Sequence, residues 1–345
     1  MALNVIAGPC SAESEEQVMK TAAGLKLHGI STFRAGIWKP RTHPGCFEGV
    51  GSKGLPWLER VKTELGMRVC TEVAGAKHVE ACLSHGIDLV WIGARTTANP
   101  FLVQEIAESL RGTDVEVLVK NPVNPDIELW VGAIERLRLQ GVSRLGVIHR
   151  GFSTFDKIRY RNAPDWSVAV EMRSRYPELP FFCDPSHMGG KRAYVAEIAQ
   201  RALDLGLDGL MVESHCDPSC ALSDADQQLR PDDLAAILSG LVVRRSDAED
   251  ESYRQDMREL RDRMDLVDDS LVRLLSERME LSRRIGDVKK RSNVAIIQTV
   301  RWDEVMDRVN ANPSAMSLDR KFLERIFNVI HEASIAEQNK IISEK

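Results

Sequence analysis

The sequence predicts an α/β fold, a (β/α)8 TIM barrel followed by a small all-α domain of three helices, and three observations support this class. Through the first 243 residues, short apolar segments rich in β-branched residues alternate with longer amphipathic segments. The short segments, such as 145–148 and 210–212, are almost continuously apolar, which is typical of parallel strands covered on both faces. Beyond Val243 the strand pattern ends and only helical periodicity continues.

Eight segments have this strand character, and amphipathic segments follow them. The expected strands are 3–8, 31–36, 68–73, 89–94, 116–121, 144–150, 181–186 and 209–214, and clear helical patterns cover 15–28, 55–65, 99–110, 126–139, 191–205 and 231–241. Eight strand–helix units in roughly 240 residues match the size of a (β/α)8 barrel. A doubly wound open sheet is the alternative. The strand count favours the barrel, and no glycine-rich dinucleotide fingerprint follows the first strand.

The remainder of the chain predicts a second domain. We expect a barrel over 1–243, a polar linker over 244–254 and a helical domain over 255–345. From Met257 apolar residues recur at alternating steps of three and four, which predicts a helix of about 35 residues, or roughly 50 Å. Shorter helices are expected over 299–310 and from Asp319 almost to the end of the sequence. Two short helices cannot cover a stripe of that length, so we expect the domain to form a homodimer.

Composition narrows the class of protein. The chain has 345 residues, of which 28% are charged and 43% hydrophobic, and this length favours two domains. The net charge of -5 indicates no nucleic acid partner, and no segment has the roughly 20 apolar residues of a membrane span. The apolar run over 3–8 is too short for a signal peptide, and seven scattered cysteines favour reduced thiols. We therefore expect a cytoplasmic protein.

Charged side chains follow the expected strands where a barrel has its active site. Five of them are cations, Arg34, Lys39, Arg95, Lys120 and Arg150, and Glu72 lies on the third strand. Cations that converge at one mouth need anions to meet them, and phosphates and carboxylates are the expected ligands.

A second group of residues predicts a metal site. Cys10, His187 and Glu213 follow or end expected strands, and Asp224 comes eleven residues after Glu213. A thiolate, an imidazole and two carboxylates suit a divalent transition metal ion better than magnesium.

Six motifs in the barrel segment carry a family resemblance. They are Gly8-Pro9-Cys10-Ser11-Ala12-Glu13, Lys39-Pro40-Arg41-Thr42, Gly93-Ala94-Arg95, Asp184-Pro185-Ser186-His187, Val212-Glu213-Ser214-His215 and Ala221-Leu222-Ser223-Asp224. In these motifs the chain resembles the short type I form of 3-deoxy-D-arabino-heptulosonate-7-phosphate (DAHP) synthase, which condenses phosphoenolpyruvate with erythrose 4-phosphate.

The resemblance implies a role for each of these groups. Cys10, His187, Glu213 and Asp224 would be the metal ligands, for manganese, iron, cobalt or zinc, and the five cations would bind phosphoenolpyruvate. Arg41 and Thr42 would hold the phosphate of erythrose 4-phosphate. Lys39 would act as the acid near the aldehyde, and Glu72 would orient groups or the water. The related octulosonate 8-phosphate synthases have Lys-Ala-Asn-Arg where this chain has Lys-Pro-Arg-Thr, and that difference favours the four-carbon sugar.

The helical segment has its own candidate residues. Arg278 falls on the apolar seam of the long helix, and Lys289 lies within about 20° of the same face at 100° per residue. Arg261 lies about 100° away, outside the reach of the same pocket in one chain. In the last helix the apolar stripe continues as Ser334 and Gln338, which indicates a small wet cavity between helices.

Over about 255–342 the chain resembles the all-helical (type II) chorismate mutases. The resemblance implies that Arg278, Lys289 and Arg301 bind the carboxylates and ether oxygen of chorismate, with Ser334 and Gln338 closing the pocket and Arg261 reaching the partner subunit's site. Lys289 and Gln338 would stabilise charge on the breaking ether bond. Two positions depart from the family, because Gln298 stands where an aspartate is common and Trp302 where many members have glutamate.

Three hypotheses about function follow. The first is a bifunctional enzyme of the shikimate pathway that forms DAHP and converts chorismate to prephenate. In the second, the helical domain is a non-catalytic module that binds chorismate or prephenate, dimerises and inhibits the barrel. The third is a generic metal-dependent aldolase with a helical tail, which the number of cations disfavours.

Overall fold

The computed structural model describes residues 3–40, 45–155, 158–245, 250–297 and 299–343. The chain divides into two compact units, Met1–Ser246 and Asp247–Lys345, and each is described by itself. The described part of the chain contains no helix long and apolar enough to cross a membrane.

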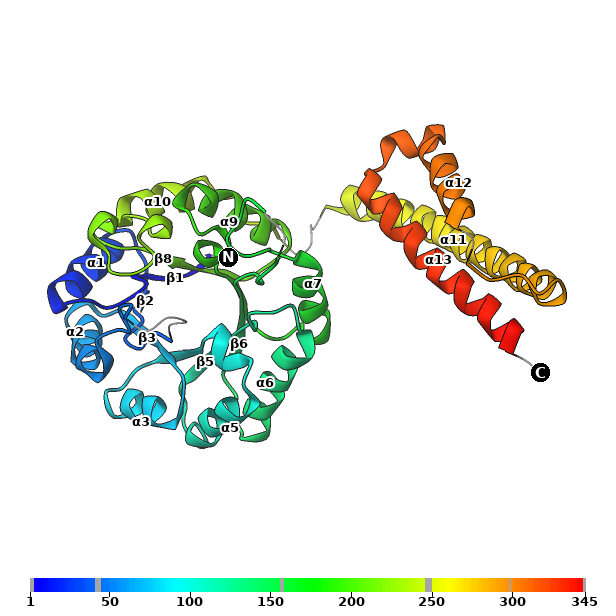
Figure 1. Ribbon diagram of the computed structural model, residues 1–345. Helices are drawn as coiled ribbons and strands as arrows, with labels where there is room; N and C mark the ends of the chain where they lie inside the picture. Colours follow the sequence, from blue (N-terminus) through cyan, green and yellow to red (C-terminus); the bar gives the residue numbers. More distant parts are fainter. Residues whose placement is uncertain (1–2, 41–44, 156–157, 246–249, 298, 344–345) are drawn as a thin grey trace. The chain divides into compact units, whose positions relative to one another are not determined.

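The first unit is a closed barrel in which the strands follow one another in chain order (Figure 1). All neighbouring strands are parallel, and β1 pairs with β8 from Asn4 opposite Gly209 to Gly8 opposite Glu213, which closes the barrel. The strands are β1 (Asn4–Gly8), β2 (Thr32–Arg34), β3 (Arg68–Val73), β4 (Leu89–Ile92), β5 (Glu116–Lys120), β6 (Leu145–His149), β7 (Phe181–Cys183) and β8 (Gly209–Glu213). The predicted barrel is therefore confirmed, and the open sheet is excluded.

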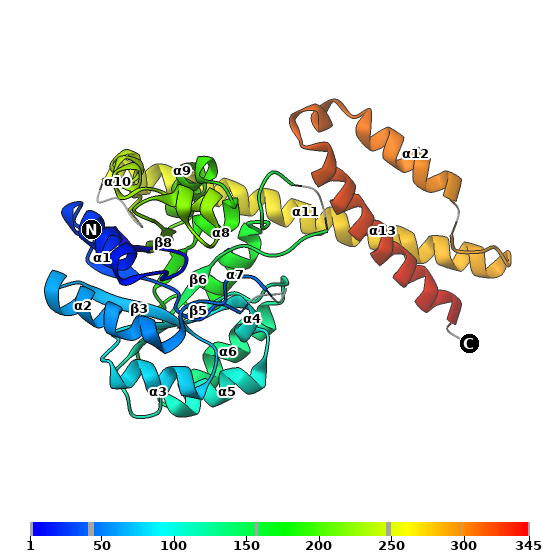
Figure 2. The same cartoon turned by 60° about the vertical axis from the view of Figure 1, so that its left-hand side comes forward.

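Helices surround the strands (Figures 1 and 2). They are α1 (Glu15–Leu27), α2 (Leu55–Leu65), α3 (Ala76–Ser84), α4 (Ala94–Thr97), α5 (Pro100–Ser109), α6 (Ile127–Leu139), α7 (Trp166–Arg175), α8 (Pro185–Gly189), α9 (Val195–Asp204) and α10 (Pro231–Gly240). Short 3-10 helices are η1 (Gly51–Gly54), η2 (Arg192–Tyr194), η3 (Pro218–Cys220) and η4 (Ala225–Gln227).

Three strands end two or three residues earlier than the sequence predicts, and a helix begins directly after two of them. The predicted strand 181–186 stops at Cys183, where the Asp184 carboxylate accepts a hydrogen bond from His187 N and Pro185 occupies the first turn of α8. The predicted strand 89–94 stops at Ile92 because α4 begins at Ala94. The predicted strand 31–36 stops at Arg34. These early ends place helical backbone at the mouth of the barrel.

The core has two layers that follow from the alternation of side chains along each strand. One layer fills the barrel interior and consists of Ile6, Cys70, Leu89, Trp91, Leu118, Ile148, Phe182 and Met211. Their neighbours in sequence, such as Val90 and Ile92 on β4, point outward and pack in the larger cluster with the surrounding helices. Trp91 is fully buried in the interior layer, and its ring lies beneath the mouth residues described below.

The second unit is built on one long helix. It contains α11 (Glu251–Arg291), α12 (Thr299–Asn310), the 3-10 turn η5 (Pro313–Ser317) and α13 (Arg320–Ser343), and α11 and α13 lie side by side (Figure 2). The helix α11 has 41 residues, about 60 Å at 1.5 Å per residue. It begins at Glu251 rather than at Met257 as predicted, because the Asp250 side chain caps it by accepting from Ser252 N at 2.9 Å.

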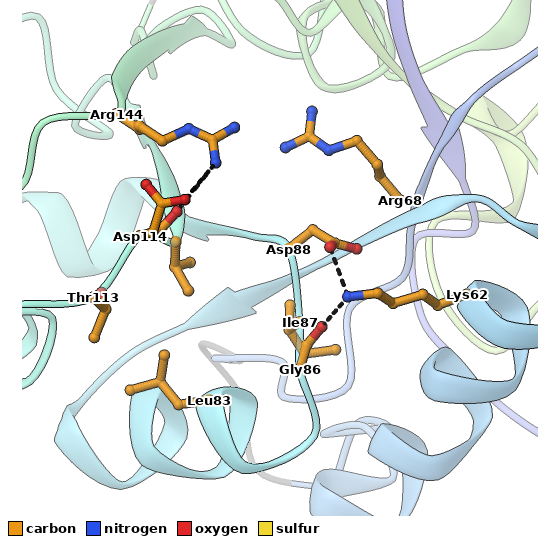
Figure 3. A pocket seen from close by; sticks show the side chains of 10 residues that line it. Lys62, Arg68, Leu83, Gly86, Ile87, Asp88, Thr113, Asp114 and Arg144 are labelled. Carbon is orange, nitrogen blue, oxygen red and sulfur yellow. Dashed lines mark hydrogen bonds and ion pairs between the residues drawn. The ribbon is translucent and has the colours of Figure 1, made fainter.

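At the amino ends of the barrel strands, charged side chains line a cavity of about 330 Å³ (Figure 3). The Lys62 ammonium lies 2.7 Å from Asp88, and Arg144 lies 3.5 Å from Asp114. The site residues predicted from the sequence do not line this cavity. Those of the barrel unit that the structure describes lie at the opposite, carboxyl ends of the strands.

Candidate functional site

The carboxyl ends of the strands bring the predicted barrel residues to one mouth. Three of them, Arg34, Lys120 and Glu213, are the last residues of β2, β5 and β8. Glu72 lies within β3, and the other predicted barrel residues that the structure describes lie in the segments that follow a strand. Parallel strands end on the same side of a barrel, and this topology is why residues distant in sequence meet here.

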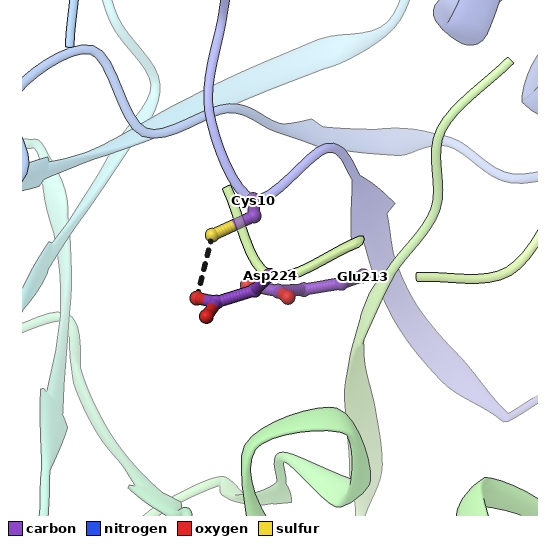
Figure 4. Close-up of side chains that lie close together, drawn as sticks. All are labelled: Cys10, Glu213 and Asp224. Carbon is purple, nitrogen blue, oxygen red and sulfur yellow. Dashed lines mark hydrogen bonds between the residues drawn. The ribbon is translucent and has the colours of Figure 1, made fainter. Parts of the chain in front are cut away.

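Cys10, Glu213 and Asp224 form a group whose ligand atoms all lie within 4.8 Å of one another (Figure 4). The Cys10 thiol donates to Asp224 Oδ2 at 3.2 Å, and Gln228 Oε1 accepts from Cys10 N at 2.9 Å. The turn into Cys10 requires Gly8, because a Cβ there would lie 2.0 Å from the Arg34 carbonyl oxygen and the φ of Gly8 is +151°.

His187, the fourth predicted ligand, lies beside this group without belonging to the set of three. Its Nε2 is 3.5 Å from Glu213 Oε1, and its Nδ1 is 2.7 Å from Asp184 Oδ2. The short helix α8 holds the imidazole at the mouth, with its Nδ1 beside the Asp184 carboxylate.

The electrostatics of the group suit a cation. Burial, together with the Glu213 charge, raises the pKa of the Cys10 thiol to about 12. Burial opposes the charge on Asp224, yet His187 and Arg161 hold the pKa of that carboxyl well below its usual range. The donor set of one thiol, two ionised carboxylates and an adjacent imidazole fits a divalent transition metal ion. A bound cation favours the thiolate, so such an ion would displace the thiol proton.

Two predicted cations, Arg34 and Lys120, are buried above the Trp91 ring, at 4.8 Å and 5.7 Å from its centroid. Arg34 lies 3.2 Å from Glu213 Oε1, and the Lys120 ammonium lies 2.7 Å from Asp184 Oδ2. Carboxylates of the chain itself therefore pair with both cations, in addition to any phosphate or carboxylate of a ligand.

Lys39 lies against the candidate metal ligands. Its ammonium donates to the Cys10 carbonyl oxygen at 2.9 Å and to Cys10 Sγ at 3.1 Å. Burial opposes its charge, but Cys10 and Glu72 raise the pKa of Lys39 above its usual value. A Cβ at Gly36 would lie 2.7 Å from the Cys10 carbonyl oxygen and 3.2 Å from Lys39 Nζ, so glycine is required for this close approach.

Glu72 lies beside the buried cations. Its Oε2 accepts from Trp91 Nε1 at 3.2 Å. A Cβ at Gly93 would lie 2.0 Å from Glu72 Oε1, so the glycine of the predicted Gly93-Ala94-Arg95 motif provides the space for this carboxylate.

The outer part of the mouth carries further positive charge. Arg150 donates to Asn162 Oδ1 at 3.0 Å, and burial lowers the pKa of its guanidinium to about 10, with Arg161 and Arg95 lowering it further. Arg95 is exposed on α4. This concentration of like charge is a suitable environment for a phosphorylated ligand. Arg41 and Thr42, predicted to hold the sugar phosphate, lie outside the described residues.

Sequence reasoning missed two residues at the mouth, Arg161 and Gln227. Arg161 donates to Asp224 Oδ1 and to Gln227 Oε1, both at 3.0 Å, and Gln227 donates to Glu213 Oε2 at 2.7 Å. Arg161 lies in a segment without periodicity or motif, so its sequence gives no signal. Gln227 follows Asp224 closely, and a polar residue so near a predicted ligand was the one available indication.

In the helical unit, Arg278 and Ser334 come together as predicted. Arg278 donates to Ser334 Oγ at 2.5 Å and to the Ile330 carbonyl oxygen at 3.4 Å. Gln338 is buried, and its Oε1 has no hydrogen-bond partner within the described part of the chain. Burial lowers the pKa of Arg278, and Arg308 lowers it further.

The other predicted residues of this unit are more dispersed. Lys289 donates to the Ile296 carbonyl oxygen at 2.5 Å. Burial lowers the pKa of His331, and the charges of Arg278 and Lys289 lower it further. Arg301 is exposed and pairs with Glu304 at 2.7 Å, Arg261 is exposed on α11, and Gln298 lies outside the described residues. The Trp302 ring lies 4.4 Å from the His331 ring.

The strand ends of this parallel barrel combine transition-metal donors with clustered cations. This combination defines a class of protein, the barrels that act on phosphorylated and carboxylated substrates. The chain belongs to the DAHP synthetase I family, whose family model matches residues 1–247. The model of chorismate mutase type II matches residues 260–339.

Individual relatives agree with this assignment. The chain is 36% identical over 225 residues to the phospho-2-dehydro-3-deoxyheptonate aldolase of Thermotoga maritima, an alignment that spans 65% of this chain and 64% of that protein. It is 30% identical over 271 residues to the 2-dehydro-3-deoxyphosphooctonate aldolase of Desulfotalea psychrophila, spanning 72% and 91%. The crystal structure of the Thermotoga maritima DAHP synthase matches with a TM-score of 0.62 at 32% identity, over 76% of this chain and 70% of that one.

These findings confirm the family resemblance and the barrel predicted from the sequence. The two family models match the two segments for which the sequence predicts these families, the barrel and the helical segment. The chain spans just under two thirds of the Thermotoga protein that it matches.

Proposed function

We propose that the barrel condenses phosphoenolpyruvate with erythrose 4-phosphate to DAHP and phosphate, and that the helical unit rearranges chorismate to prephenate. The observation that carries the proposal is the meeting of Cys10, Glu213 and Asp224 with buried Arg34 and Lys120 at one barrel mouth. Such a mouth serves a reaction in which phosphate and carboxylate groups bind beside an electrophilic carbonyl.

The metal requirement is part of the proposal. Cys10, His187, Glu213 and Asp224 would hold a divalent manganese, iron, cobalt or zinc ion. When bound, such an ion supplies Lewis acidity to the aldehyde oxygen of the sugar.

The chain's own residues would bind and orient the substrates. Arg34 and Lys120 would receive the carboxylate and phosphate of phosphoenolpyruvate, while Arg95 and Arg150 add positive charge from the outer mouth. The enol carbon then attacks the aldehyde, water adds to the central carbon, and phosphate leaves. Lys39 would deliver a proton to the former aldehyde oxygen, and its contact with Cys10 supports this role. Glu72 would orient the water.

The identity of the sugar is a separate proposal. Relatives include octonate aldolases as well as the heptonate aldolase. The Lys39-Pro40-Arg41-Thr42 motif supports the four-carbon sugar phosphate, with Arg41 and Thr42 holding its phosphate.

In the helical unit, Arg278, Lys289 and Arg301 would bind the anionic groups of chorismate. Ser334 and Gln338 would close the pocket, Gln298 would bind the hydroxyl, and Arg261 would reach the partner subunit's site. No covalent step is needed, because holding the compact conformer and stabilising charge on the ether oxygen lower the barrier. The contact of Arg278 with Ser334 and the open Gln338 Oε1 support this pocket.

A homodimer through the helical unit belongs to the proposal. Apolar side chains along α11 are exposed at the predicted seam, with Leu260 at 55%, Met264 at 61% and Leu271 at 53%. An exposed stripe of this length favours burial against a second copy of the same helix.

One observation favours the alternative, a helical unit that binds chorismate or prephenate without turnover and regulates the barrel. Trp302, which stands where many chorismate mutases have glutamate, packs on His331. The ring therefore occupies space beside Arg278 and Lys289, whose charges act on the same His331.

The domain limits 1–243, 244–254 and 255–345 stay a prediction. A cytoplasmic location is likewise proposed, and the free state of all seven cysteines, which the described residues include, supports a reducing compartment.

The test measures phosphoenolpyruvate consumption and chorismate loss separately in the full chain supplied with each divalent metal. Cys10→Ala should abolish only the first activity, whereas Cys82→Ala, an equal loss of a buried thiol away from the mouth, should preserve it. Arg278→Ala should abolish only the second, whereas Arg283→Ala on the same helix should not. Chorismate that binds without turnover would favour the regulatory alternative. If no divalent metal supports phosphoenolpyruvate consumption, the activity proposed for the barrel is refuted.

A further inference from the structure

Two residues connect the carboxylates of Glu213 and Asp224, and we name this connection the Arg161–Gln227 bridge. The Gln227 amide nitrogen donates to Glu213 Oε2 at 2.7 Å, and its amide oxygen accepts from Arg161 at 3.0 Å. The same Arg161 nitrogen donates to Asp224 Oδ1 at 3.0 Å. One chain of hydrogen bonds therefore spans both carboxylates.

The bridge occupies one oxygen of each carboxylate and leaves the other directed at the candidate metal site. The remaining oxygen of Asp224, Oδ2, lies 3.2 Å from Cys10 Sγ. The remaining oxygen of Glu213, Oε1, lies 3.5 Å from His187 Nε2 and 3.2 Å from Arg34. The oxygens outside the bridge thus face the thiol and the imidazole.

The chemistry of the bridge permits one arrangement of the Gln227 amide. A guanidinium can only donate hydrogen bonds, and an ionised carboxylate can only accept them. Exchanging the amide oxygen and nitrogen would place donor against donor and acceptor against acceptor. Since Gln227 is buried at 1% exposure, neither end could turn to water instead.

The backbone around the bridge is shaped for it. Gly190 has a φ of +67°, and a Cβ there would lie 2.5 Å from Arg161 Cβ, so only glycine leaves room for the arginine. Asp224 adopts a left-handed φ of +48° directly before η4, which carries Gln227. A non-glycine residue in this conformation is held by its surroundings.

We propose that Arg161 and Gln227 are positioning residues, which fix Glu213 and Asp224 so that each offers one oxygen to the metal ion. This inference rests on the proposed metal dependence of the barrel. Hydrogen bonds to metal-binding carboxylates set ligand geometry, and their loss weakens metal binding by roughly 10- to 100-fold.

Arg192 provides a matched control for Arg161. Both arginines are exposed, and both donate hydrogen bonds to the segment 224–227. Arg192, however, donates to the backbone oxygens of Ala225 and Asp226, at 3.1 Å and 3.4 Å. Arg192→Leu and Arg161→Leu therefore remove the same charge and a similar tether. They differ in whether a ligand carboxylate loses its partner.

The experiment titrates Co²⁺ alone into the metal-free full chain and records affinity, the thiolate-to-cobalt charge-transfer band and the visible d–d absorption. Arg161→Leu and Gln227→Met should each weaken Co²⁺ binding by roughly 10- to 100-fold relative to Arg192→Leu. Gln227→Met should also weaken the d–d bands, because a freed Glu213 carboxylate can bind through both oxygens and raise the coordination number. A purely structural role would not change this spectrum.

The outcomes separate the inference from the proposed function. A wild-type chain without the charge-transfer band, or a Cys10→Ala variant that binds Co²⁺ equally well, would overturn the metal centre itself. A wild-type chain with the band, and an Arg161→Leu variant identical to Arg192→Leu in affinity and spectrum, would overturn the bridge alone. Because Arg161 lies at the surface, the Arg161→Leu variant decides this question even if Gln227→Met does not fold.

Discussion

Two lysine–aspartate pairs in the barrel unit have the same length and different burial. The Lys120–Asp184 pair at the mouth and the Lys62–Asp88 pair at the amino end of the barrel (Figure 3) both join Nζ to a carboxylate oxygen at 2.7 Å. The side chains of the first pair are 6% and 0% exposed, and those of the second are 39% and 23% exposed. Replacement of each lysine by methionine isolates the effect of burial on an ion pair.

The expected magnitudes differ by several kcal/mol. Lys120→Met removes the ammonium from the buried Asp184 carboxylate and leaves that carboxylate beside the His187 imidazole, and breaking a buried pair in this way costs about 3–5 kcal/mol. Lys62→Met leaves Asp88 in contact with water, which costs about 0–1 kcal/mol. For a domain of this size, 1 kcal/mol corresponds to roughly 2–4 °C in melting temperature, so Lys120→Met should lower the barrel transition by roughly 6–20 °C.

Calorimetry of the full chain measures both variants, and the barrel transition is followed separately from that of the helical unit. The double variant Lys120→Met/Asp184→Asn should recover part of the loss, since it removes the unpaired charge. Equal melting temperatures for Lys120→Met and Lys62→Met, or no recovery in the double variant, would refute the reasoning that burial makes the mouth pair essential.

Two further predictions concern the mouth and its neighbourhood. Gly93→Ala should displace the Glu72 carboxylate, whose Oε1 would lie 2.0 Å from the new Cβ. The variant should lower kcat for condensation by roughly 100-fold and largely keep the melting temperature. An unchanged kcat would argue against a role for Glu72. Burial lowers the pKa of His149 to about 4, so between pH 6.5 and 4 the unfolded chain binds a proton that the folded chain does not. Stability should therefore fall by about 2 kcal/mol from pH 7 to pH 5 on account of this group, and urea unfolding of His149→Phe should show a correspondingly flatter pH dependence.

The sequence was sufficient for the barrel because its topology makes the strand ends converge. Short, almost continuously apolar segments located the eight strands, and the residues after them meet at one mouth because parallel strands end on the same side of a barrel. The placement of Cys10, Glu213 and Asp224 within 4.8 Å follows from that rule and from the motifs.

The remaining features of the mouth depend on side-chain packing that no periodicity encodes. Trp91 looks in sequence like any strand residue, yet it is the surface over which Arg34 and Lys120 lie. Asp184 belongs to a motif that the sequence shows, but its pairing with Lys120 depends on where α8 begins. Arg161 comes from a long loop whose course no local pattern fixes.

The exposed apolar stripe on α11 has a consequence for how the stability of the helical unit is defined. Side chains such as Leu260, Met264 and Leu271 contribute little while they face water, and they contribute fully only against a second chain. In the proposed homodimer the folded helical unit would be stabilised by association, and its population would follow mass action. Dilution alone should lower its melting temperature, whereas the barrel, which closes on its own strands, should melt at the same temperature at every concentration.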